Sequence, residues 1–107
     1  FRGDRVKLRE VFLNLLRNAR ESIDGKGSIR LDAACSSSEI VVAIRDTGCG
    51  IGQEQLDHIF EPFVTFKKGG TGLGLAVADR TVRAHGGKIS VTSAVNAGTE
   101  FRVSLPV

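Results

Sequence analysis

Gly69-Gly70-Thr71-Gly72-Leu73-Gly74-Leu75 places four glycines within seven residues, and the segment that follows is rich in helix-forming residues. Glycine in that density disfavours a strand or a helix interior, because each one adds backbone entropy that folding must remove. A glycine-rich loop that enters a helix offers free backbone N–H groups and the positive end of the helix dipole. The stretch therefore predicts either a phosphate site or a flexible connector, and alone it does not separate the two.

The 107 residues suffice for one domain with a single hydrophobic core. No apolar run approaches the roughly 20 residues that cross a bilayer. The net charge of +3 is mild, and the Lys and Arg residues are scattered, which disfavours a nucleic-acid surface and suits a small anionic ligand. Cys35 and Cys49 lack metal-ligand spacing. The chain contains no Met and opens on Phe1, so we expect residues 1–107 to be one domain of a longer polypeptide.

A long first helix is predicted from an N-cap at Asp4 to about Ile23. Asn14 and Asn18 lie one turn apart along one edge of its apolar stripe. Asn is a poor residue for a helix interior, because its amide competes for backbone hydrogen bonds. The pair is therefore either two satisfied amides at the edge of the core or two ligands for a bound group. The stripe itself consists of Leu8, Val11, Phe12, Leu15, Leu16, Ala19 and Ile23.

The remaining pattern predicts strands at 28–33, 39–46, 88–93 and 99–105. A short helix at 53–60 ends before Pro62, and a second long helix runs from 72 or 73 to 84 and ends near His85. Paired strands with helices between them indicate an α+β fold, a two-layer sandwich with a mixed, mostly antiparallel sheet. We expect residues 64–70 to form a flap that carries Lys67, and Phe60 to anchor it within an aromatic cluster.

The second strand ends in Asp46-Thr47-Gly48-Cys49-Gly50-Ile51-Gly52. A buried carboxylate must be paired or hydrogen-bonded. As an acceptor it suits the exocyclic amine of a base such as adenine, while Gly48 and Gly50 let a flat ring approach the backbone. The alternative is a tight loop in which Asp46 caps the next helix.

The asparagine pair, the aspartate turn and the glycine-rich loop together describe a site for a nucleoside triphosphate with Mg²⁺. Amide oxygens are suitable ligands for this hard cation, which usually keeps waters and bridges phosphates. The chain lacks the spacing of the P-loop and of the dinucleotide-binding motif, and it lacks the eukaryotic kinase motifs. These three classes of nucleotide-binding protein are therefore disfavoured.

The combination resembles the GHKL ATPases. Asn14-Leu15-Leu16-Arg17-Asn18-Ala19 is similar to their N box, and Asp46-x-Gly48-x-Gly50-Ile51 to their G1 box. Phe60-Glu61-Pro62-Phe63 and Gly70-Thr71-Gly72-Leu73-Gly74-Leu75 are similar to the F and G2 boxes of the bacterial sensor histidine kinases, in particular the nitrogen-regulation-like subgroup. Gly98-Thr99-x-Phe101 is similar to the closing strand of that branch.

The resemblance implies a Bergerat-type sandwich in which ATP lies between the helices and under a lid. It implies that Asn18 ligates Mg²⁺ with the help of Asn14, both as catalytic residues, and that Asp46 receives the adenine amine. We also expect the lid to be the most mobile segment when no nucleotide is bound. The other implied ATP-binding residues are Gly48, Gly50, Ile51, Phe60, Lys67, Gly70, Thr71, Gly72, Leu73, Gly74, Leu75 and Thr99.

Neither His58 nor His85 fits the phosphoacceptor pattern of this family. The resemblance therefore implies a protein-histidine kinase domain that supplies the γ-phosphoryl group of ATP to a histidine in a separate dimerisation domain of the same polypeptide. A response regulator receiver domain is the implied downstream partner. We expect a cytoplasmic domain without membrane or nucleic-acid contact, whether or not the full-length protein is membrane-anchored. The alternatives are a serine kinase of the anti-sigma-factor type and a degenerate nucleotide-binding docking module.

Overall fold

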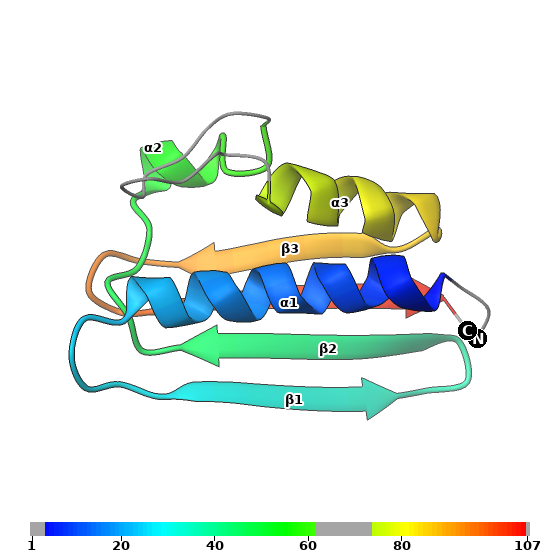
Figure 1. Ribbon diagram of the computed structural model, residues 1–107, viewed down its shortest axis with the longest axis horizontal. Helices are drawn as coiled ribbons and strands as arrows, with labels where there is room; N and C mark the ends of the chain where they lie inside the picture. Colours follow the sequence, from blue (N-terminus) through cyan, green and yellow to red (C-terminus); the bar gives the residue numbers. More distant parts are fainter. Residues whose placement is uncertain (1–3, 62–73, 107) are drawn as a thin grey trace.

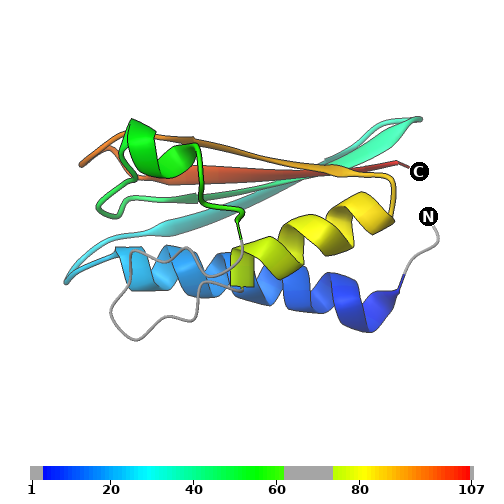
Figure 2. The same ribbon diagram turned by 90° about the horizontal axis from the view of Figure 1, so that it is seen from above.

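The structure, a computed structural model, describes residues 4–61 and 74–106 as two layers. Helices α1 (Arg5–Ser22) and α3 (Gly74–Ala84) lie on one face of a four-stranded sheet (Figure 1), and the view from above separates the two layers (Figure 2). The strands are β1 (Ile29–Cys35), β2 (Glu39–Asp46), β3 (Lys88–Ser93) and β4 (Thr99–Pro106), in the order β1-β2-β4-β3. The predicted α+β sandwich is confirmed.

The sheet differs from the prediction in one respect, because every strand pair in the described residues is antiparallel rather than mixed. The connection from β2 passes through α2 (Gln53–Leu56) and α3, and β3 then runs in the same direction as β2. Strand β4 lies between these two strands and opposes both. The two strands that could have formed a parallel pair are thus kept apart.

Several element boundaries also differ from the prediction by one or more residues. The helix predicted over 53–60 ends at Leu56, and the residues after it form tighter turns in which His58 and Glu61 donate their backbone N–H groups three residues back. Strand β1 continues to Cys35, because that residue pairs with Ile40 across the hairpin. The predicted start of the second long helix at 72 or 73 lies outside the described residues; α3 is described from Gly74.

The core lies between α1, α3 and the inner face of the sheet. The predicted stripe of α1 supplies Leu8, Val11, Leu15 and Ala19, which are buried at three- and four-residue steps. The sheet and the remaining segments supply Ile44, Ile59, Ala78, Val82, Ile89, Phe101, Val103 and Leu105. No helix within residues 4–61 and 74–106 combines the length and the apolar character that a membrane span requires.

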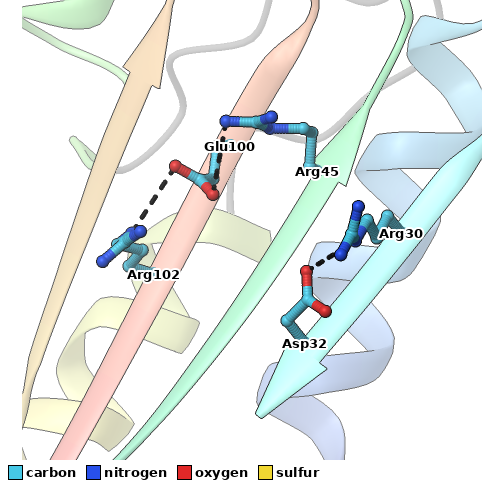
Figure 3. A network of polar contacts seen from close by, with 5 residues as sticks. All are labelled: Arg30, Asp32, Arg45, Glu100 and Arg102. Carbon is cyan, nitrogen blue, oxygen red and sulfur yellow. Dashed lines mark hydrogen bonds and ion pairs between the residues drawn. The ribbon is translucent and has the colours of Figure 1, made fainter. Parts of the chain in front are cut away.

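Strand β1 lies beyond the cover of the helices (Figure 1), although its inward positions are apolar. Leu31 is directly opposite the buried Ile44 and so faces the helix layer, yet Leu31 is 52% exposed. The outer face of the sheet is polar (Figure 3): Glu100 pairs with Arg45 at 3.8 Å and with Arg102 at 3.5 Å. Exposed pairs of this kind add little stability.

The start of α1 is fixed by the predicted cap, since an Asp4 carboxylate oxygen accepts the Lys7 N–H at 3.1 Å. The Asp4 N–H in turn donates to His85 Nε2 at 2.9 Å, just beyond the end of α3. His85 is therefore a cap-region residue, as predicted. Asp4→Ala should destabilise the domain by about 1 kcal/mol, which thermal unfolding would register as a lower Tm. Asp4→Ser, which keeps a capping oxygen, should melt close to wild type; equal melting of both variants would contradict the role of the cap.

Candidate functional site

Three polar side chains form a row across one end of the sheet. The register places Asp46 of β2 opposite Thr99 of β4, and Thr99 opposite Ser93 of β3. Asp46 and Thr99 stand two residues from the buried Ile44 and Phe101, so the row faces the helix layer. The C-terminal end of α1 and α2 lie at this same end (Figure 1). The motif that begins at Asp46 on β2 and the Gly98-Thr99-x-Phe101 motif of β4 are thus brought together.

Asp46 is the most unusual member of the row, because it is a carboxylate with only 4% of its surface exposed. One carboxylate oxygen accepts the Gly48 N–H at 2.8 Å. The other has no hydrogen bond or ion pair within the described residues. Every fully enclosed side-chain N or O atom of that part of the chain has a partner, so this second oxygen is reachable from outside. A buried acceptor with one open position fits a ligand that donates a hydrogen bond.

The alternative prediction for Asp46 is half right. The contact with Gly48 does form a tight loop, but the N-cap of α2 is Gly52, so Asp46 caps no helix in the described residues. The loop closure uses one carboxylate oxygen and leaves the second one open.

The two glycines of the loop have packing reasons of their own. A Cβ on Gly48 would collide with Ser22 at the end of α1, and a Cβ on Gly50 would collide with the carbonyl oxygen of Ala94. Between them, Cys49 donates its N–H to Ser22 O at 3.0 Å and accepts from Asn96 N at 2.7 Å. The loop is therefore clamped between α1 and the turn after β3. A contact of these glycines with a base stays a prediction.

Ser93 is a residue that the sequence analysis missed. Its hydroxyl oxygen lies 2.8 Å from three groups: the Ile51 N–H, the Gly98 carbonyl and the Thr99 hydroxyl. The signal was present in β3, where Ile89, Val91 and Ser93 alternate on the face that packs on the core. A hydroxyl at the third position of such a series indicates a polar partner in the interior. It holds the predicted residues Ile51 and Thr99 in place.

Asn14 of α1 lies next to the start of α3. Asn14 donates from its amide nitrogen to the Gly74 carbonyl at a long 3.4 Å, and its amide oxygen is the first atom that a Cβ on Gly74 would meet, at 3.6 Å. Asn14 and Asn18 are both half-buried and one turn apart. The last glycine of the glycine-rich stretch is thus in contact with the first asparagine of the pair. Amide oxygens here are a donor set that suits Mg²⁺.

Phe60, which is predicted to anchor the flap, packs on the core from the segment after α2. Its ring makes an edge-to-face contact with Phe101 at 6.4 Å between centroids and 74° between planes. Phe101 belongs to the core and is 4% exposed. This position holds the chain close to the Asp46–Thr99 row, while direct contact of Phe60 with ATP stays a prediction.

Among the described residues, the structure pairs Asp46 with Thr99 and places Asn14 against Gly74. The predicted flap over 64–70 and the expected mobility of the lid fall within residues 62–73, outside the described residues. Leu75 packs against the core from the first turn of α3. The predicted site residues that lie outside the described ranges are Lys67, Gly70, Thr71, Gly72 and Leu73.

Residues 3–107 match the family model described as "Histidine kinase-, DNA gyrase B-, and HSP90-like ATPase". The chain belongs to this ATPase family. Sporulation kinase D of Bacillus subtilis is 43% identical over 100 residues, which is 94% of this chain and 20% of that protein. The sensory histidine kinase/phosphatase NtrB of Rhodobacter capsulatus is 42% identical over 118 residues, which is 98% of this chain and 33% of that protein. The ATPase chain thus spans a fifth to a third of the length of these relatives.

Solved structures agree with this assignment. The mycobacterial sensor histidine kinase MprB superimposes with a TM-score of 0.87 at 30% identity, over 97% of this chain and 72% of its own. Full-length ShkA in complex with AMPPNP has a TM-score of 0.83 at 34% identity, over 94% of this chain and 21% of its own. The predicted family, its fold and its histidine-kinase branch are confirmed.

Proposed function

We propose that this chain is the ATP-binding and catalytic domain of a sensor histidine kinase, which binds ATP with Mg²⁺ and supplies the γ-phosphoryl group to a histidine in another domain. The observation that supports this best is Asp46, a carboxylate buried to 4% exposure with one oxygen open to a donor. An exocyclic amine of adenine is such a donor. ShkA, which shares the fold, is described with AMPPNP, an analogue of ATP.

Different residues of the proposed site bind the base and the metal of the ligand. Asp46, with Thr99 beside it, receives the base. Asn14, where α1 contacts the start of α3, and Asn18, one turn further along α1, offer amide oxygens to Mg²⁺. When bound, the metal neutralises charge on the phosphates and orients the γ-phosphoryl group. The chain itself contributes position and electrostatics rather than a covalent intermediate. The lid residues 67 and 70–74 close over the phosphates in this proposal.

The histidines of the chain are engaged elsewhere. The ring nitrogens of His85 contact Asp4 N and Thr81 O at 2.9 Å and 2.8 Å, and His58 pairs with Glu61 on the surface. We therefore place the phosphoacceptor in a dimerisation domain of a longer cytoplasmic or membrane-anchored kinase, with this domain in the cytoplasm. A response regulator receiver domain would then accept the phosphoryl group. Relatives three to five times as long support this arrangement.

The proposal is tested by calorimetry with ATP and MgCl₂, and by transfer of labelled phosphate to an added histidine phosphoacceptor domain from one of the relatives. Wild type should bind ATP and transfer label. Asn18→Ala should lose about tenfold in Mg²⁺-dependent affinity, whereas Arg9→Ala, about 180° around α1, should behave as wild type.

A folded wild-type protein that binds no ATP refutes the proposal. Binding with transfer only to serine, or with no transfer at all, favours the serine-kinase or docking alternative.

A further inference from the structure

The hydroxyl of Ser93 has three hydrogen-bonding neighbours but only one proton to donate. Its oxygen lies 2.8 Å from the Ile51 nitrogen, from the Gly98 carbonyl oxygen and from the Thr99 hydroxyl oxygen. A serine hydroxyl has one proton to donate and two positions to accept. The Ile51 N–H is a donor only, so it occupies one accepting position. The single Ser93 proton must then go either to Gly98 O or to Thr99 Oγ.

Donation of the Ser93 proton to the Gly98 carbonyl is the arrangement that satisfies every group. Gly98 O can only accept, and Gly98 is buried, so a Ser93 proton given to Thr99 would deprive this buried carbonyl of its side-chain partner. With the Ser93 proton on Gly98 O, the second accepting position of Ser93 is free for the Thr99 hydroxyl. Thr99 then donates to Ser93 at 2.8 Å, and all three contacts exist at once. Thr99 has no proton left for the site and presents only lone pairs.

This direction matters because Thr99 is the register partner of Asp46. Both side chains are 4% exposed and on the same face of the sheet. The carboxylate also presents only acceptors on its open side. Two adjacent buried acceptors favour a ligand edge with an amine and disfavour one with a keto oxygen, which would leave lone pairs facing lone pairs.

We infer that Ser93 is a specificity-determining positioning residue: it turns the Thr99 hydroxyl proton away from the site, so that Thr99 and Asp46 together select a 6-amino purine over a 6-keto purine. The inference rests on the proposed nucleotide-binding function and adds a residue and a selectivity to it. Ser93 has a second, linked effect, since it also holds the Ile51 N–H and with it the loop after Asp46.

The test is the ratio of affinities for ATP and for inosine triphosphate, which carries a keto group in place of the 6-amine, measured by calorimetry on wild type and on Ser93→Ala. Without Ser93, the Thr99 hydroxyl is free to turn and donate to the keto oxygen. The preference for ATP should therefore fall about five- to tenfold, and the Ile51 amide should exchange its hydrogen faster. Ser93→Thr keeps the hydroxyl and should restore the wild-type ratio.

The ratio separates selection from simple support of the fold. A purely structural Ser93 would weaken both nucleotides equally in Ser93→Ala, and an unchanged ratio overturns the inference. In a Thr99→Val background, Ser93→Ala should no longer change the ratio, because the hydroxyl it orients is gone. If Ser93→Ala fails to fold, Ser93→Cys, a weaker donor and acceptor, must still lower the ratio. Wild type that binds neither nucleotide refutes the proposed function, whereas binding with an unchanged ratio overturns the inference alone.

Discussion

Asp46→Asn should weaken ATP binding by about ten- to hundredfold while the domain stays folded. The variant keeps one oxygen to accept the Gly48 N–H, which the wild type holds at 2.8 Å, so the loop can still close. The other oxygen becomes an amide NH₂, which meets the donating amine of adenine with a second donor. A hydrogen bond to a charged group contributes about 1.5–3 kcal/mol net, and every 1.4 kcal/mol is about a tenfold change in affinity. Calorimetry with ATP and MgCl₂ measures the loss directly.

Asp32→Asn is the matched control for this change. This substitution has the same chemistry and changes the net charge by the same amount. Asp32, however, lies on the exposed side of β1, in an ion pair with Arg30 at 2.9 Å (Figure 3). It should bind ATP as wild type does. Thermal unfolding of both variants checks that each is folded. If folded Asp46→Asn binds ATP with the affinity of Asp32→Asn, Asp46 does not recognise the base.

The sequence predicted those features that depend on local spacing. The stripe of α1 follows from the helical period, and its members Leu8, Val11, Leu15 and Ala19 are the buried ones. The position of Asp46 was predicted for a similar reason, because a charged residue that ends an apolar strand must find a partner. Such patterns are written into neighbouring residues, so they can be recognised without the tertiary structure.

Features that depend on which segments meet could not be predicted in this way. The alternation of β1 predicts an inner face for Leu31, but burial depends on where α1 crosses the sheet, and α1 leaves β1 uncovered. The role of Ser93 depends on the register of β3 with β4, which brings Thr99 opposite it. The edge-to-face contact of Phe60 with Phe101 likewise joins segments that are far apart in the sequence.

The glycines of the loop after β2 illustrate this limit, and they make a second prediction with a large effect. From the sequence alone, Gly50 is predicted to let a flat ring approach the backbone. In the structure Gly50 has a φ of +73°, and its open side faces the Ala94 carbonyl. Two separate costs therefore oppose any side chain at this position: a left-handed backbone and a collision with another segment of the chain. Substitutions at three glycines can separate them.

Gly50→Ala should lower the free energy of unfolding by about 2–4 kcal/mol. The left-handed backbone accounts for about 1–2 kcal/mol of this loss. The rest comes from displacement of the 94–98 turn, which includes the Asn96–Cys49 hydrogen bond of 2.7 Å. Gly25→Ala, at φ +84° with no atom within 4 Å of the added carbon, isolates the backbone cost. Gly52→Ala, at φ −69° with its nearest neighbours 3.8 Å away, has neither cost and should lose less than about 1 kcal/mol as a poorer N-cap.

Thermal or denaturant unfolding should rank the three variants in that order, with Gly50→Ala the least stable. If Gly50→Ala melts together with Gly25→Ala, the Ala94 contact yields freely and the loop is not clamped; if it melts well below, Gly50 is required by the backbone of the protein itself, whatever ligand lies beyond it.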